Sequence, residues 1–211
     1  MRVVGIRRGA VRPCVTQRLV RRQRSADVPA EDPRQRAIDA AVELFHREGF
    51  GAVGIDRLTT SIGMSKRTLY KYFDSKDDLL LAVLDSCEGM ALRDLPDEDD
   101  DSSPRDRILA VFDAQAKYCT DPDFAGCFFV NIATEFRDPD HRAVRIAADH
   151  KAKLTQFLVR QARLAGVAAP DDLAEQLTVL HTGAADYALL YGHYPDSTRT
   201  AVAALLTAAG L

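Results

Sequence analysis

Hydrophobic residues recur every three or four positions along most of the chain after residue 31, which is the spacing of one buried face of an α-helix. The first periodic segment starts at Asp32-Pro33, where aspartate can cap a helix and proline suits the first helical position. It stops before Gly49, because glycine favours the turn that follows a helix. Its expected buried positions are Ala37, Ile38, Ala41, Leu44 and Phe45.

Three further helices are expected before residue 94. One covers Ile55–Ile62 and is broken by Gly63, and the next is capped by Ser65 and runs to about Phe73. Ser75 can cap the third, and the acidic residues that follow it suit the positive end of the helix dipole.

The acidic stretch 94–104, DLPDEDDDSSP, contains few apolar residues and is expected to form a solvated loop. Helical spacing resumes at Ser103-Pro104 and continues in segments that end near residues 119, 165, 191 and 209. The apolar sequence AGCFFVNIATEF lies between two of these segments. Because no segment shows sustained strand-like alternation, the pattern predicts an all-α protein of about nine helices.

Charge is distributed unevenly, although the whole chain has a net charge of only −3. Residues 1–32 hold eight arginines and three acidic residues, whereas residues 81–211 hold twelve basic and twenty-one acidic residues. A basic N-terminal part and an acidic C-terminal part indicate that the N-terminal part of the chain binds a polyanion. Residues 1–31 are expected to be a disordered basic tail, or a segment that results from a start site placed too far upstream. A basic arm that enters the minor groove of DNA and a transit peptide are the alternatives.

The segments 55–62 and 65–73, joined by a turn at Gly63-Met64, have the spacing of a helix-turn-helix. In such a unit the second helix lies in the major groove of DNA. Leu69 and Phe73 stand four positions apart and are expected to face the core. The rest of SKRTLYKYF offers cations, hydroxyls and phenols without an acidic residue, a combination that suits phosphates and base edges.

This part of the chain resembles the DNA-binding domain of the TetR family of transcriptional regulators. The family pattern AA-x-x-LF-x-x-x-GF is filled by Ala40-Ala41, Leu44-Phe45 and Gly49-Phe50. Its continuation is filled by Gly63-Met64-Ser65, Thr68-Leu69-Tyr70, Tyr72-Phe73 and Ser75-Lys76. The match covers about residues 34–84 in one register. The resemblance implies a homodimer whose two recognition helices bind a pseudo-palindromic double-stranded DNA operator, with repression as the default and release by a small-molecule effector.

The resemblance divides the chain into a helix-turn-helix domain at 32–78 and a helical effector-binding and dimerisation domain at 79–211. Gly54 departs from the family, which usually offers a hydroxyl there, and Arg67 stands where glycine is frequent. These departures leave the fold prediction intact and make the transfer of a known operator unsafe. The predicted DNA-binding positions are Gly54, Ser65, Lys66, Arg67, Thr68, Tyr70, Lys71, Tyr72 and Lys76.

By position in the family, the last two helices form the expected dimer surface, and two from each subunit could make a four-helix bundle. A monomer core that buries the same residues is the alternative. The expected interface residues are Leu177, Leu180, Ala184, Ala188, Tyr191, Val202, Leu205 and Leu206.

Candidates for effector binding are polar or aromatic side chains within apolar helices. Asn131 is favoured among them, because a buried amide needs a partner that a ligand could supply. The alternative is a packed core in which Asn131 bonds to the backbone. The candidates are Gln115, Tyr118, Cys127, Phe128, Asn131, Phe157, His181 and Tyr187.

Other chemistry finds little support in the sequence. The four cysteines lack CxxC spacing and indicate reduced thiols in a cytosolic protein, and the five histidines show no ligand spacing, so no metal or cofactor is expected. No apolar run is long enough to cross a membrane. Sequence signatures of enzymes are absent, so no catalytic residue is expected. Two alternatives remain: an architectural DNA-binding protein of low specificity that relies on its basic tail, and a helical enzyme.

Overall fold

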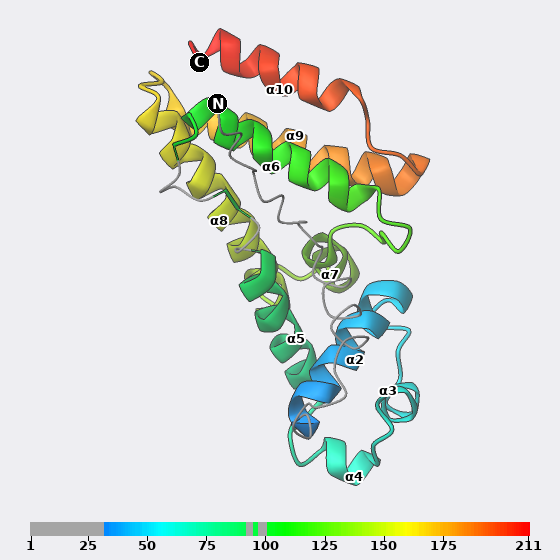
Figure 1. Cartoon of the computed structure of the whole chain (residues 1–211). Helices are drawn as coiled ribbons and strands as arrows, with labels where there is room; N and C mark the ends of the chain where they lie inside the picture. Colours follow the sequence, from blue (N-terminus) through cyan, green and yellow to red (C-terminus); the bar gives the residue numbers. More distant parts are fainter. Residues whose placement is uncertain (1–31, 92–94, 97–100) are drawn as a thin grey trace, which may run out of the picture.

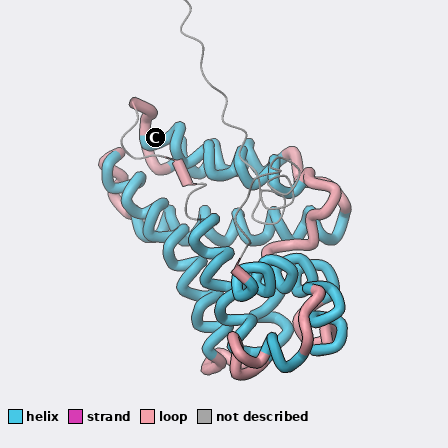
Figure 2. Tube along the Cα trace, turned by 60° about the horizontal axis from the view of Figure 1, so that its bottom comes forward, coloured by secondary structure: helices cyan, strands magenta, loops and turns pink. Residues whose placement is uncertain are grey.

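A computed structural model describes residues 32–91, 95–96 and 101–211. The predictions for the basic tail at 1–31 and for part of the acidic loop therefore lie outside the described residues. Within them the chain forms helices joined by short loops and no strand, which confirms the all-α prediction (Figure 2). The helices are α2 (Pro33–Glu48), α3 (Ile55–Ile62), α4 (Lys66–Leu69), α5 (Lys76–Ala91), α6 (Pro104–Cys119), α7 (Phe128–Phe136), α8 (Arg142–Leu164), α9 (Pro170–Tyr191) and α10 (Ser197–Ala208).

Most helix ends lie where capping chemistry predicts them. The Asp32 side chain accepts a hydrogen bond from the amide of Arg34 at the start of α2, and Gly49 ends that helix with a φ of 82°. Ser75 accepts a hydrogen bond from the amide of Asp78 at the start of α5. These contacts satisfy backbone groups that have no partner within their own helix.

Helix α4 is shorter than the predicted segment 65–73, because regular α-helix ends at Leu69. Beyond that residue the amides of Lys71 and Tyr72 bond to carbonyls only three residues back, which tightens the chain into turns. The amide of Phe73 still bonds to the carbonyl of Leu69, so the segment keeps Phe73 on the buried side. The prediction of the buried face is confirmed, and the prediction of the helix length is wrong.

Two apolar cores follow each other along the molecule. The first joins residues of α2, α3, α4 and α5 with residues of α7 and the start of α8. The second joins α6, the later part of α8, α9 and α10. Figure 1 shows the consequence: α4 lies at one end of the molecule, α10 at the other, and the long helix α8 connects the two regions. The first core continues across residue 78, the predicted domain boundary, and that boundary stays a prediction.

The residues expected to form the dimer surface mostly lie inside the single chain. Leu177, Ala184, Ala188, Val202 and Leu206 are buried in this subunit, and Leu180 and Leu205 pack partly buried against the second core. The five buried side chains therefore face neighbouring helices of their own chain, whereas Leu180 and Leu205 keep part of their surface exposed. The predicted interface as a whole stays a prediction. Tyr191 alone of the predicted set is exposed.

Candidate nucleic-acid interface

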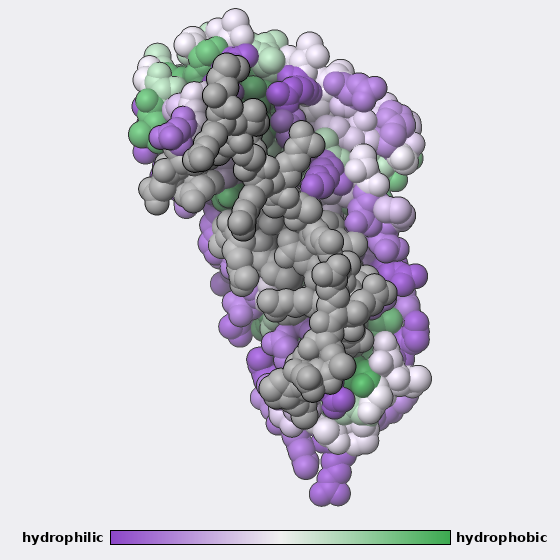
Figure 3. Space-filling model, in the orientation of Figure 1, coloured by the Kyte–Doolittle hydropathy of each residue, from purple (hydrophilic) through white to green (hydrophobic). Residues whose placement is uncertain are grey.

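The face of α4 is organised by its N-terminal cap. The Ser65 hydroxyl accepts a hydrogen bond from the amide of Thr68 and contacts the Thr68 hydroxyl at 2.8 Å. Leu69 and Phe73 anchor the segment in the first core. Hydrophilic side chains project from this end of the molecule (Figure 3). The side chains exposed by this anchoring are Lys66, Arg67, Tyr70, Lys71 and Tyr72.

The two tyrosines are unusually exposed for aromatic residues, at 48% for Tyr70 and 37% for Tyr72. Phenol hydroxyls can donate to phosphate oxygens, and the rings add apolar contact area. From residue 57 to residue 73 the chain carries four cations and no acidic residue. The exposed face therefore combines positive charge with hydrogen-bond donors, as a DNA-binding surface requires.

One cation of this face already has an acidic partner on α3. The Lys66 ammonium lies 2.7 Å from a carboxylate oxygen of Asp56, and this hydrogen bond raises the pKa of Lys66 above its usual value. Lys66 is thus held positively charged. Because the pair is solvent-exposed, a phosphate oxygen could displace Asp56 at little cost.

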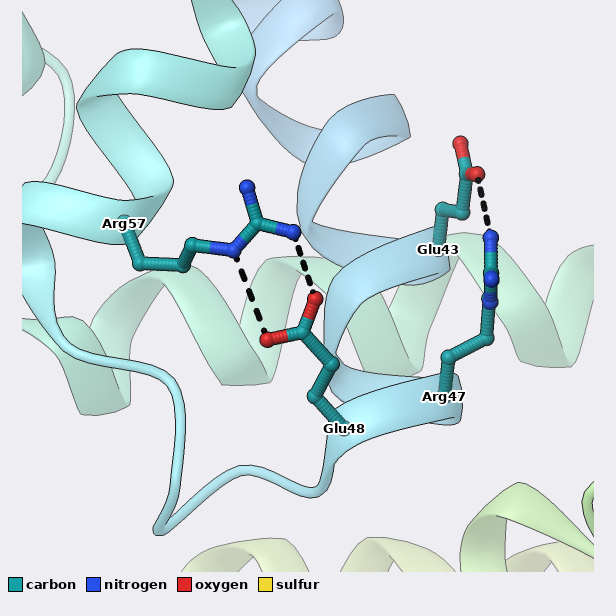
Figure 4. A network of polar contacts seen from close by, with 4 residues as sticks. All are labelled: Glu43, Arg47, Glu48 and Arg57. Atoms are coloured by element: carbon teal, nitrogen blue, oxygen red, sulfur yellow. Dashed lines mark hydrogen bonds and ion pairs between the residues drawn. The ribbon is translucent and has the colours of Figure 1, made fainter.

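One ion pair braces α3, the helix that precedes the turn, and a second lies within α2 (Figure 4). The Arg57 guanidinium donates to both carboxylate oxygens of Glu48, at 2.7 and 3.4 Å, and so joins α3 to α2. This bond lowers the pKa of Glu48. Arg47 pairs with Glu43 one turn earlier on α2. Arg57 therefore contributes to the orientation of α3.

The structure places two other predicted DNA-binding residues differently. Gly54 precedes α3 without a side-chain cap, in an exposed position that has open space around it. The Lys76 ammonium lies 4.0 Å from the centroid of the Phe50 ring, a cation–π contact, and burial lowers its pKa. Lys76 is thus in contact with the loop between α2 and α3.

The predicted effector residues divide into separate groups. The Gln115 side-chain amide donates to Nδ1 of His181, at 3.1 Å, and to the His181 carbonyl, and the Tyr194 hydroxyl donates to Gln115 at 3.0 Å. This network joins α6 to α9 and to the segment before α10. Phe157 lies buried in the second core, and Tyr187 is exposed and packs on Tyr191.

A second group surrounds the loop before α7. The Asn131 amide donates to the carbonyl of Ala125 at 2.7 Å, so the alternative of a backbone-bonded Asn131 describes the structure. The Tyr118 hydroxyl donates to the carbonyl of Gly126 at 3.3 Å, and the His46 ring contacts the same carbonyl at 3.1 Å. Cys127 caps α7 without a side-chain hydrogen bond, and Phe128 is buried beside it.

Sequence reasoning missed three residues of these networks, namely His46, Tyr194 and Glu135. Each meets a partner at least 79 positions away, so no local pattern could indicate the contact.

Across residues 32–91, 95–96 and 101–211 no three metal-ligating side chains gather in one place. None of the helices in the described ranges has the length and hydropathy of a membrane span.

Comparisons with known proteins agree with this geometry. Residues 37–83 match the family of bacterial regulatory proteins called the tetR family. The transcriptional repressor BdcR of Escherichia coli is 30% identical over 125 residues, which cover 58% of this chain and 63% of BdcR. The repressor ComR of Escherichia coli is 31% identical over 149 residues, which cover 67% of this chain and 71% of ComR. The match thus spans less than two thirds of BdcR and more than two thirds of ComR.

A solved structure extends the likeness over the whole fold. A TetR-type regulator from Streptomyces avermitilis is 36% identical, with a TM-score of 0.79, over 86% of this chain and 100% of that protein. The chain belongs to the TetR family, whose members are DNA-binding transcriptional regulators.

Proposed function

We propose that the chain represses transcription by placing the exposed face of α4 and of the turns that follow it in the major groove of an operator. The observation that carries this proposal is the cationic surface formed by Lys66, Arg67, Tyr70, Lys71 and Tyr72, a segment that contains no acidic residue of its own. The two relatives named above are repressors, which supports this direction of regulation. Ser65 and Thr68 contribute by fixing the first turn of α4.

We further propose that a second copy of the chain packs against the outer face of α9. Val179, Tyr187, Leu190 and Tyr191 are all exposed; Tyr187 lies two helical turns after Val179, and Leu190 and Tyr191 lie three and four positions after Tyr187, so they form one apolar stripe on the helix. Gly183 lies in the same stripe, and open space surrounds the position that its Cβ would occupy. Two such stripes could approach closely across a twofold axis, which is the usual symmetry of a dimer.

An effector is proposed to act through the polar contacts that hold α6, α7 and α9 together. Gln115 with His181, and Asn131 with the loop before α7, are polar contacts beside the two apolar cores. A small molecule that competes for one of these partners would change the packing of its helix. DNA and effector would then oppose each other, because coupling between two binding sites is reciprocal.

The test is fluorescence anisotropy of the protein on DNA from upstream of its own coding region, against scrambled DNA, across a salt series. We expect a preference for the upstream DNA that persists as salt rises. Lys71→Ala should weaken binding and reduce the slope of log affinity against log salt by about one. Lys117→Ala, which removes an exposed cation from α6, is the matched control.

Equal binding to both DNAs with a steep dependence on salt would instead favour an architectural DNA-binding protein. In that case Lys71→Ala would have little effect, because the arginine-rich residues 1–31 would supply most phosphate contacts. Absence of binding by a folded dimer would contradict the proposal.

A further inference from the structure

The loop between α2 and α3 is held by a carboxylate from a distant part of the chain. One oxygen of Glu135, in the last turn of α7, accepts a hydrogen bond from the amide of Phe50 at 3.0 Å. The other oxygen accepts from the amide of Gly51. Hydrogen bonds to an ionised acceptor are about twice as strong as neutral ones, and this carboxylate uses both of its oxygens.

The loop is shaped to admit this carboxylate. A Cβ at position 51 would lie 2.7 Å from an oxygen of Glu135, which is closer than real Cβ contacts allow. Gly49 adopts a φ of 82°, a left-handed conformation that glycine accepts without strain. Both glycines therefore let the backbone turn its amides toward Glu135.

Aromatic packing surrounds the same contact. The Phe50 ring lies 5.3 Å from the ring of Phe136, the residue that follows Glu135, and Phe136 stacks on His141 at 3.9 Å. Lys76 covers the Phe50 ring from the first turn of α5. The loop thus contacts α5 and α7, and Phe136 of α7 in turn contacts His141, the residue that caps α8. Glu135 supplies the charged hydrogen bonds to the loop.

We propose that Glu135 is a positioning residue that sets the orientation of the DNA-binding helices relative to the rest of the molecule. The inference rests on the proposed DNA-binding function. Helix α3 begins at Ile55, four residues after Gly51, and a tight turn at Gly63 joins it to α4. A shift of the loop would therefore reorient α3 and carry α4 with it.

Helix α7 also connects Glu135 to predicted effector residues. Asn131 lies one helical turn before Glu135 and bonds to the carbonyl of Ala125, in the loop where Gly126 accepts from Tyr118. A Cβ at Gly126 would lie 3.1 Å from the Asn131 side chain, so loop and helix are closely packed. An effector that displaces Asn131 or this loop would move the last turn of α7, and Glu135 would transmit the movement to the α2–α3 loop.

The first experiment compares the full chain with Glu135→Gln by hydrogen exchange of the amides of Phe50 and Gly51 and by operator binding. The amide nitrogen of glutamine cannot accept a hydrogen bond, so one of the two backbone amides loses its acceptor. We expect exchange of these amides to accelerate, and operator affinity to fall, by about tenfold each. Glu43→Gln removes the same charge from an exposed pair on α2 and should change neither.

A second variant separates positioning from charge. Gly51→Ala keeps the carboxylate but places a methyl group against it, so operator affinity should fall as in Glu135→Gln. In the Glu135→Ala background the same glycine substitution should cost much less, because the conflicting oxygen is absent. Such non-additivity is the signature of two residues in contact. Thermal unfolding of each variant shows that binding is measured on folded protein.

Unchanged exchange at Phe50 and Gly51 in Glu135→Gln would overturn the proposed contact. Faster exchange with unchanged operator affinity would overturn the positioning role. If the wild-type chain binds no operator, the DNA-binding proposal itself fails. Exchange at the two amides then still decides whether Glu135 holds the loop, so the two failures are distinguishable.

Discussion

Acidification from pH 7 to pH 5 should destabilise the fold through two histidines of the interior. Nδ1 of His181 accepts a hydrogen bond from the Gln115 amide, so a proton on that nitrogen would set two donors against each other. The His150 ring stacks on Phe129 at 3.8 Å, and its Nδ1 is buried without a hydrogen-bond partner. Burial, with a further contribution from the Lys151 charge, lowers the pKa of His181 to about 3 and that of His150 to about 4.

These lowered pKa values determine the direction of the effect. In the unfolded chain both histidines take up a proton near their ordinary pKa of 6.5, while in the folded chain they remain neutral. Stability is therefore fully present above pH 6.5 and is lost as the pH falls from there toward the folded-state pKa values. Each histidine should contribute a loss of about 2 kcal/mol between pH 7 and pH 5. Burial also lowers the pKa of His46, which acts in the same direction.

Urea denaturation at pH 7 and pH 5, followed by circular dichroism at one protein concentration, measures this loss. His150→Phe preserves an aromatic ring against Phe129 and removes the titrating group, so the difference between the two pH values should shrink by about 2 kcal/mol. Substitution of His193, whose ring is exposed, is the matched control. If His150→Phe loses as much stability on acidification as the wild type, the assignment to a buried neutral His150 is wrong.

Four other substitutions test parts of the structure. Leu177→Ala, in the second core, should lower the free energy of unfolding by about 2–5 kcal/mol, whereas Leu190→Ala, at a position 76% exposed, should weaken self-association in analytical ultracentrifugation. If Leu177→Ala weakened self-association and Leu190→Ala did not, the interface predicted from the sequence would be favoured instead. Ser65→Ala removes the cap of α4 and should cost about 1 kcal/mol in thermal unfolding and also weaken operator binding. Asp56→Asn releases Lys66 from its ion pair and should tighten DNA binding a few-fold at low salt; the gain should vanish at high salt, where exposed charges are screened.

The ends of helices were predictable because capping is local chemistry. Asp32, Ser65, Ser75 and Ser103 each accept a hydrogen bond from a backbone amide two or three residues later. The buried positions of the helix-turn-helix followed from spacing in the same way. Local sequence did not predict the end of α4, because its last turns depend on the anchoring of Phe73 in the core.

The faces of α9 could not be assigned from the sequence. Leu177 and Leu190 lie on the same apolar helix, and only packing against α6, α8 and α10 decides that one is buried and the other exposed. The contacts of His46 and Glu135 were equally beyond local reasoning. Their partners lie 80 or more residues away, so they appear only when the whole chain is folded.

The continuity of the first core limits how this protein could be recombined with its relatives. A hybrid that takes residues 1–78 from another regulator would keep Leu79, Leu80 and Val83 from this chain, and these side chains pack against the segment that was replaced. Residues of α7 and of the start of α8 belong to the same core. A functional exchange of DNA specificity should therefore replace only the exposed side chains of α4 and of the turns that follow it up to Tyr72. Replacing the whole N-terminal segment would bring together core side chains from two different proteins, whose shapes are not matched to each other.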